Sequence, residues 1–177
     1  MTAPKGPPWP ARIPLRASLM AILMYLDMNK YMRMAINEAR KGIRAGHGGP
    51  FGAVIVKDGI VVGKGHNQVV KNNDPTCHGE MMAIHKACKK LGTFDLSGCE
   101  LYTTGEPCPM CMAAILWANI KKVYYGCNIV DTEGIGFRDK VFYEMQGHLD
   151  EMVIELDRKA CLKLYAEYAA IEDKTNY

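Results

Sequence analysis

Apolar residues recur at helical spacing in the first regular segment of the chain. Within residues 29–46, Met32, Ile36, Ala39 and Ile43 are three or four positions apart, which is the period of an amphipathic helix. A glycine closes the segment, and glycine is a common residue just past a helix end. The pattern therefore predicts a helix that ends near this glycine.

The next segment, GAVIVKDGIVVGKGHN, has the pattern of a hairpin. Two runs rich in β-branched apolar residues lie on either side of Asp58-Gly59. An Asp-Gly pair between two such runs is a strong signal for a two-residue turn. A polar stretch, KNNDP at residues 71–75, follows and predicts a loop.

Strand and helix patterns alternate along the rest of the chain. The helix predicted through HGEMMAIHKACKKLG has lysines in its last turn and a glycine cap, and the helix predicted from PCPMC onward has a proline in its first turn. This alternation is typical of one layered α/β domain with a mixed sheet. The predicted elements are helices at 78–92, 107–120 and 161–171 and strands at 100–106, 122–127 and 152–157.

Length and composition fit a single globular domain. The chain has 177 residues, of which 49% are apolar and 23% charged, as in ordinary soluble domains. Residues 1–27 differ, because they are rich in proline and contain no acid before Asp27. An extension, an ordered part of the fold and a targeting segment all remain open for them. We place the domain at residues 28–177.

Charge and cysteine content narrow the function classes. Of the 22 lysines and arginines, three precede Asp27, which leaves 19 bases facing 19 acids. This balance argues against a nucleic-acid partner. Seven cysteines are too few for a disulfide scaffold and odd in number, so reduced thiols in a cytoplasmic protein are expected. No apolar run is long enough to predict a membrane span.

Two short motifs carry the candidate chemistry. His78 and Glu80 form an H-x-E pattern, and Cys108 and Cys111 form P-C-x-x-C about thirty residues later. This combination is the known signature of zinc deaminases. One imidazole and two thiolates would fill three of the four positions around Zn²⁺ and leave one for water. A carboxylate that lies beside that water, but is not bound to the metal, can accept a proton from the water and deliver it to the substrate.

Cys77 leaves one alternative to this catalytic interpretation. A fourth protein ligand would close the site and make the zinc structural. Adjacent residues at a helix start point about 100° apart, so Cys77 and His78 would reach one ion only with strain. We therefore expect Cys77 to be a packed thiol.

Residues 28–177 resemble the cytidine deaminase superfamily, and most closely the bacterial guanine deaminases. The resemblance runs through GGPFGAVIVKDG, GHN, NDPTCHGE, LYTTGEPCPMC, GFRDKVFYE and the C-terminal tyrosine. It implies a three-layer αβα fold with a five-stranded mixed sheet and one zinc ion held at two helix N-termini. It also implies hydrolysis of guanine to xanthine and ammonia, in purine catabolism or salvage.

The resemblance further implies residues that bind the base. Asn67 matches the family's base-binding asparagine, Phe51 an aromatic residue that packs on the purine, and Asp139 an acid that contacts the ring N–H and amino groups. Tyr177 matches a tyrosine that closes the site of the neighbouring subunit in a domain-swapped homodimer. A turn residue, a core phenylalanine and a surface acid are the ordinary alternatives for the first three.

Two departures leave the substrate open. Gly79 and Cys77 stand where the family usually has alanine, and HGE, GHN and LYTT are also similar to fungal cytosine deaminases. The alternatives are therefore a cytosine deaminase and a tRNA adenosine deaminase. Residues 150–177 hold seven acids and four bases, which disfavours a phosphate-binding tail.

Overall fold

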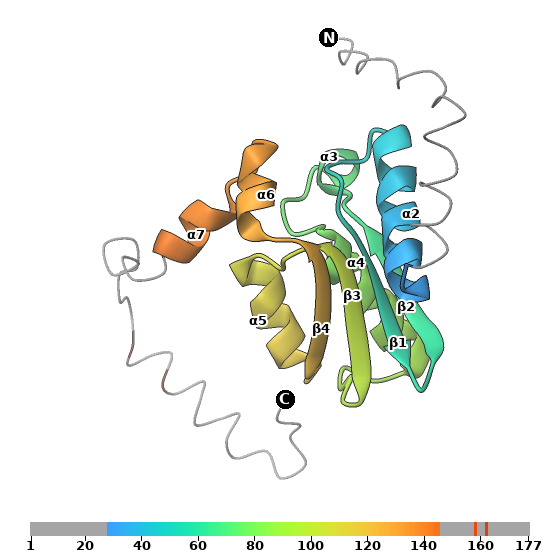
Figure 1. The fold of residues 1–177 in the computed structure, drawn as a ribbon. Coiled ribbons are helices and arrows are strands. Elements are labelled where there is room, and N and C mark those ends of the chain that lie inside the picture. The colour runs from blue at the N-terminus through green and yellow to red at the C-terminus, as the bar shows by residue number, and fades with distance from the viewer. Residues whose placement is uncertain (1–27, 146–157, 159–161, 163–177) are drawn as a thin grey trace, which may run out of the picture.

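The computed structural model describes residues 28–145, Arg158 and Leu162. Figure 1 shows a twisted sheet with helices on both faces. The strands are β1 (Gly52–Lys57), β2 (Ile60–His66), β3 (Cys99–Gly105) and β4 (Lys122–Cys127). The helices are α2 (Lys30–Arg44), α3 (Val69–Asn72), α4 (Gly79–Leu91), α5 (Pro109–Trp117), α6 (Ile129–Gly134) and α7 (Asp139–Met145).

The sheet is mixed, as the alternating pattern predicts. Its strand order is β2-β1-β3-β4, in which β1 pairs antiparallel with both β2 and β3, and β3 pairs parallel with β4. The parallel pair is joined through α5. The carboxyl end of β3 and the amino ends of α4 and α5 consequently meet at one end of the sheet, the upper end in Figure 1.

Alternate residues of β1 face two different cores. Val54 and Val56 pack with Ala35 of α2 on one face, whereas Ala53 and Ile55 pack with residues of α4 and α5 on the other. A strand buried on both faces reads as a continuous apolar run rather than an alternating one. The structure therefore confirms a layered α/β domain with α2 on one face and α4 and α5 on the other.

Glycines on β2 let α4 lie unusually close to the sheet. A Cβ added at Gly65 would lie 2.4 Å from the carbonyl oxygen of Gly79 and 2.6 Å from the amide nitrogen of Ala83. One added at Gly63 would lie 2.3 Å from the carbonyl oxygen of Ala83. Real Cβ atoms do not approach backbone atoms so closely. The two glycines therefore allow the short distance between β2 and the first turns of α4.

Most predicted elements are confirmed. The hairpin turns at Asp58 and Gly59, both with positive φ, as a type I′ turn requires. Helix α2 begins after Asn29, whose side chain accepts hydrogen bonds from the amides of Tyr31 and Met32. Helix α4 ends at Gly92 in the left-handed conformation.

Three features differ from the sequence prediction. The predicted loop at 71–75 begins inside the short helix α3, because the carbonyl of His47 accepts hydrogen bonds from the amides of Val70 and Lys71. Helices α6 and α7 were not predicted either; α6 begins with a capping box between Asn128 and Asp131. The fifth strand predicted at 152–157 lies outside the described residues, as does the helix predicted at 161–171 apart from Leu162. The sheet of the described residues has four strands.

No helix in the described part of the chain is long and apolar enough to cross a membrane.

Enlarging Gly65 should destabilise the domain. In a Gly65→Ala variant the new methyl group meets the backbone of α4, and overpacking of this kind costs about 1–3 kcal/mol. The free energy of unfolding, measured by urea denaturation, should fall by that amount. Gly134→Ala is the matched control, since a Cβ there has no atom within 4 Å. Equal stability of the two variants would show that the close approach is not tight.

Candidate metal centre and active site

The two sequence motifs meet because both lie at helix N-termini. His78 occupies the N-cap position of α4, and Cys108 occupies that of α5, both with extended backbone angles. N-cap side chains ordinarily accept hydrogen bonds from the first helical amides, but neither of these two does so. Each side chain is instead directed at the other: Cys108 Sγ lies 3.6 Å from His78 Nδ1.

Cys111 completes a compact group of three possible metal ligands. It lies in the first turn of α5, and one ligand atom from each of His78, Cys108 and Cys111 lies within 4.8 Å of the other two. Cys111 is fully buried and Cys108 is 6% exposed, whereas His78 is partly exposed. This is the one such group that the described residues form.

The protonation of the three groups is coupled. Hydrogen bonds from Cys111 and His78 lower the pKa of the Cys108 thiol to about 4, although burial opposes this. The same contact with Cys108 raises the pKa of His78. Cys111 keeps its proton, because donating to Cys108 and burial both raise the pKa of its thiol. The thiolate form of Cys108 is thus already favoured, and a bound cation would also favour the thiolate form of Cys111.

The donor set fits zinc. Two cysteines and one histidine are ligands that Zn²⁺ binds in tetrahedral sites, and three protein ligands leave one position open. His78 and Cys108 also line a cavity, so that position can be reached by a small molecule. The arrangement is that of a catalytic rather than a structural zinc site.

Glu80 lies beside this group and is almost completely buried. Its Oε1 accepts a hydrogen bond of 2.8 Å from the hydroxyl of Thr103, and its Oε2 lies 3.6 Å from Cys111 Sγ. Burial raises the pKa of this carboxyl group. A carboxyl group with a raised pKa in a cavity next to possible metal ligands is a candidate for acid–base chemistry.

Thr103 is a site residue that the sequence interpretation missed. It shares one face of β3 with Leu101 and Cys99, which belong to the apolar core, and it is completely buried. A polar residue in a core-facing strand position is the signal that could have identified it.

Cys77 is turned away from the candidate ligands. Its Sγ donates to Asp74 Oδ2 at 3.4 Å and accepts from Asn72 Nδ2 at 3.3 Å. Both partners belong to the segment before α4, and Cys77 is not part of the group of possible metal ligands in the described residues. Its side chain is buried, in agreement with the packed thiol that we expected.

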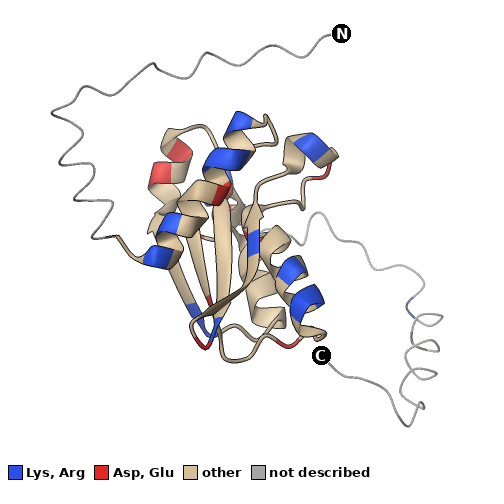
Figure 2. Ribbon diagram, turned by 90° about the vertical axis from the view of Figure 1, so that its right-hand side faces the viewer, with Lys and Arg blue, Asp and Glu red and all other residues tan. Residues whose placement is uncertain are grey.

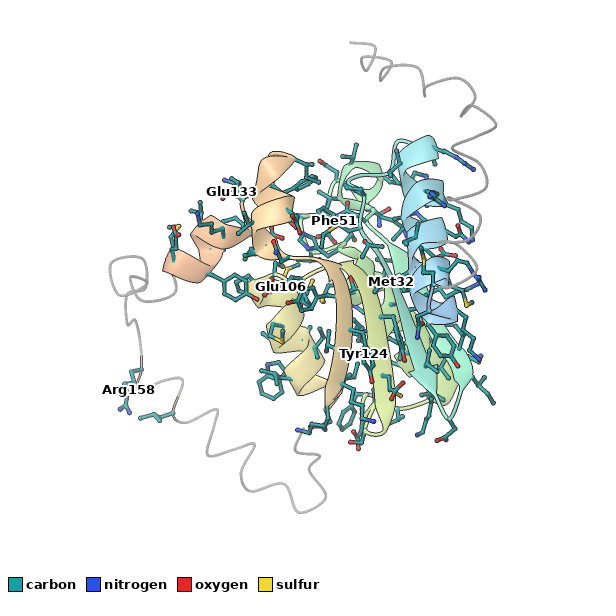
Figure 3. The ribbon with its side chains drawn as sticks, viewed as in Figure 1. Met32, Phe51, Glu106, Tyr124, Glu133 and Arg158 are labelled. Carbon is teal, nitrogen blue, oxygen red and sulfur yellow. The ribbon has the colours of Figure 1, made fainter. Side chains whose placement is uncertain are left out.

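The cavity in front of Glu80 has a volume of about 790 Å³, within the usual range for small-molecule sites. Its walls come mainly from loops and from the short helices α3 and α7. Figure 3 shows Phe51 and Glu106 near this end of the sheet, and Tyr124 toward the other end of β4. The lining includes Asn67, Phe51 and Asp139, three of the four residues for which the sequence predicts base binding.

Asn67 and Phe51 combine structural contacts with exposure to the cavity. The Asn67 carboxamide oxygen accepts a hydrogen bond from Val69 N at 3.2 Å, so the residue also serves as the turn residue of the alternative interpretation. Phe51 packs edge-on against Phe137, with ring centroids 4.8 Å apart. Nothing in the sequence marks Phe137 as part of the cavity.

Asp139 reaches the cavity from the first turn of α7. Burial raises the pKa of its carboxyl group, and the nearby Cys108 adds to that effect. Arg138 and Phe142 line the same wall. The fourth predicted residue, Tyr177, lies outside the described residues.

The lysine and arginine positions drawn in Figure 2 are spread over several elements. Those of α2 lie apart from those at the end of α4.

Two deaminases are among the curated proteins that are similar to this chain. Guanine deaminase of Bacillus subtilis is 50% identical over 119 residues, which cover 67% of this chain and 76% of that protein. A tRNA-specific adenosine deaminase of Aquifex aeolicus is 37% identical over 141 residues, which cover 73% of this chain and 93% of that protein.

Solved structures and a family model agree with these relatives. The crystal structure of the Bacillus subtilis guanine deaminase superposes with a TM-score of 0.75 at 40% identity, covering 85% of this chain and 99% of that one. Guanine deaminase from Nitrosomonas europaea superposes with a TM-score of 0.59 at 29% identity, covering 67% of this chain and 72% of that one. The model of the cytidine and deoxycytidylate deaminase zinc-binding region matches residues 27–127, more than half of the chain. With its His/Cys/Cys group at two helix N-termini, the chain belongs to this family of zinc-dependent deaminases.

Proposed function

We propose that this protein hydrolyses free guanine to xanthine and ammonia in purine catabolism or salvage. One observation carries the proposal: the buried carboxylate Glu80, held by Thr103, turns its second oxygen to the His/Cys/Cys group at the wall of a cavity lined by aromatic residues. The relatives with guanine deaminase activity support the choice of base.

The chemistry divides between the metal and one side chain. A zinc ion held by His78, Cys108 and Cys111 would supply a Lewis acid that makes water acidic near neutral pH. Glu80 takes a proton from the attacking water at Oε2, since Oε1 is engaged by Thr103. Burial raises the pKa of Glu80, which makes its carboxylate a better acceptor for the proton of the water.

The proton count follows from the substrate. The water oxygen bonds to C2 of guanine while Glu80 passes one water proton to the adjacent ring nitrogen. The second proton of the water then moves through Glu80 to the C2 amino group. The C2–N bond breaks, ammonia leaves, and C2 keeps the oxygen as the carbonyl of xanthine.

Three cavity residues are proposed to orient the base. Asp139 would accept hydrogen bonds from the ring N–H and amino groups of guanine, because a carboxylate complements donors. Asn67 would bind another polar edge, and Phe51 would pack on the ring. A polar partner missing from such an edge is costly, so these contacts would separate guanine from other bases.

We also infer that the protein is a homodimer in which Tyr177 of one subunit reaches the cavity of the other. Strand β4, at the edge of the described sheet, and the end of α5 support an interface, because both expose large apolar side chains to solvent in the described chain. They are Leu116, Trp117, Tyr124 and Tyr125.

Guanine should be the preferred substrate in an ammonia-release assay, ahead of cytosine, adenine, cytidine and a tRNA anticodon stem-loop. Glu80→Gln keeps the hydrogen bond with Thr103 possible but removes the base, and should lower kcat by about 10²–10⁴-fold with zinc content unchanged. Full activity of this variant would refute the mechanism.

In the same assay, Asp139→Asn should lower kcat/KM for guanine by about 10- to 100-fold, the value of a hydrogen bond to a charged group. Glu133→Gln on the exposed surface is its control. Preferred turnover of cytosine or of the tRNA stem-loop would replace guanine as the substrate.

Removing the thiol of Cys108, a member of the metal group, should have a different effect from removing the thiol of Cys77. Cys108→Ala should lose bound zinc, measured by atomic absorption, together with activity, because it leaves two ligands. Cys77→Ala should keep both, since its thiol is hydrogen bonded with Asn72 and Asp74. Loss of zinc from the Cys77 variant as well would indicate a closed structural site.

Mixing two inactive variants tests the dimer. If Tyr177 acts in the partner's cavity, Glu80→Gln and Tyr177→Ala subunits should form mixed dimers with one intact site, and refolding them together should restore activity. Activity no greater than that of the separate variants, or a single-subunit mass of 19.7 kDa with full activity, would contradict the swapped assembly.

A further inference from the structure

A second cluster of titratable side chains lies apart from the metal group. His66, the last residue of β2, has its Nε2 2.9 Å from Nδ1 of His47 and its Nδ1 3.6 Å from Oε2 of Glu38. The two imidazole rings are stacked, with an interplanar angle of 20°. Lys41 is hydrogen bonded to the other oxygen of Glu38. The cluster thus joins α2, β2 and the loop at 46–51.

The cluster is built into the fold. Glu38 is 7% exposed, and the His66 ring lies close to α2, where a Cβ at Gly42 would come within 2.7 Å of it. His66 Nδ1 is the one buried side-chain nitrogen or oxygen in the described chain without a hydrogen bond. A small movement toward Glu38 would satisfy it, so the contact is sensitive to the charge of both groups.

His47 connects this cluster to the wall of the cavity. Its amide donates to the carbonyl of Gly42 on α2, and its carbonyl accepts from the amides of Val70 and Lys71 on α3. The residues that follow it, Gly48 and Gly49, line the cavity. The position of His47 therefore sets the position of this part of the wall.

The loop touches the residues proposed to bind the base. A Cβ at Gly48 would fall 2.0 Å from the carboxamide oxygen of Asn67, and one at Gly49 would meet the rings of Phe51 and Phe137. The amide of Asn67 also donates to the carbonyl of Phe51. A displacement of the loop would thus move the side-chain carboxamide of Asn67 and the ring of Phe51 together.

We propose that Glu38, His66 and His47 form a proton-sensitive clasp that holds loop 46–51 against Asn67, and that the two histidines are positioning residues for base binding. In its consequence for the substrate this inference rests on the proposed function. The state of the loop itself does not depend on which base is bound.

The sensitivity to protons follows from the short contact between the rings. The facing nitrogens, Nδ1 of His47 and Nε2 of His66, can share one proton in a hydrogen bond of 2.9 Å. When both rings are charged, each of these nitrogens carries a hydrogen, and the contact becomes repulsive. The clasped state therefore binds fewer protons than the open state, so it is favoured at higher pH and lost as the pH falls.

The surrounding charges act on His66 in opposite directions. Burial lowers the pKa of His66, and the charges of His47 and Lys86 lower it further, whereas Glu38 raises it. Glu38 itself stays ionised, because Lys41 and Lys64 lower its pKa against the effect of burial. Removing the charge of Glu38 should consequently make full protonation of the histidine pair harder.

The first experiment measures the loop without substrate. Amide hydrogen exchange of residues 46–51, followed between pH 8 and pH 5 and corrected for the intrinsic pH dependence, should show lost protection at the acidic end in the wild-type protein. Glu38→Gln should move this transition to lower pH. A merely structural role of Glu38 would loosen the loop and move it to higher pH. An unchanged or upward-shifted transition would overturn the proposal.

The second experiment measures the base. His47→Phe and His66→Phe keep a stacked ring but remove the shared proton, and each should raise KM for the turned-over base about tenfold at pH 8 while kcat changes little. Their KM values should no longer rise at acidic pH as that of the wild type does. His85→Phe, at an exposed histidine on α4, should behave like the wild type.

Two results separate failure of this inference from failure of the proposed function. Absence of guanine turnover combined with an acid-induced opening of the loop would reject guanine and keep the clasp. Guanine turnover with a KM that follows the same pH course in the wild type and both histidine variants would keep the function and overturn the clasp. If His66→Phe does not fold, the same comparison is made with His47→Phe, whose residue lies in the loop rather than in the sheet.

Discussion

The structure depends on two helix N-termini meeting at one end of the sheet. His78 and Cys108 each occupy an N-cap position, and this placement brings two segments thirty residues apart within ligand distance of one another. The meeting requires α4 to lie very close to β2, which the glycines of that strand allow. It also requires α5 to start directly after β3, so that Thr103 at the end of the strand and Cys111 in the first turn of the helix both reach Glu80. The positive ends of both helices then favour the thiolate forms that a metal needs.

Local patterns were sufficient to predict the four described strands and the longer helices α2, α4 and α5, because each of these elements has its own signal. Asn29 caps α2, Asp58 and Gly59 make the hairpin turn, and Gly92 ends α4. The spacing of the metal group was equally readable, since it follows from short motifs. What the sequence could not indicate depends on contacts between distant segments: the α3 turn is stabilised by the carbonyl of His47.

The same limit applies within the site. The strand pattern can mark Thr103 as unusual, but its role follows only from the hydrogen bond that it donates to Glu80. The place of Phe137 follows only from its packing on Phe51. Residue type alone also fails to separate the histidines. His78 faces a thiolate that raises its pKa, whereas His66 is buried between a carboxylate and a second imidazole and has its pKa lowered. The surroundings, and not the side chain, determine which histidine can bind a metal and which can respond to pH.

The residues proposed to bind the metal and to transfer protons lie on a different kind of structure from the residues proposed to bind the base. The metal group and Glu80 lie on the first turns of two helices fixed against the sheet, and Thr103 lies in a central strand. Asn67, Phe51 and Asp139 come from the ends of β2 and β1 and from the short helix α7, outside the main core. Loops can change shape at little cost to a core, so the base can be altered while the hydrolytic chemistry is kept. Relatives named as a guanine deaminase and as a tRNA-specific adenosine deaminase both match this chain, as such a separation would allow. We propose that the loops select the substrate, and that in this protein a pair of histidines positions one of them.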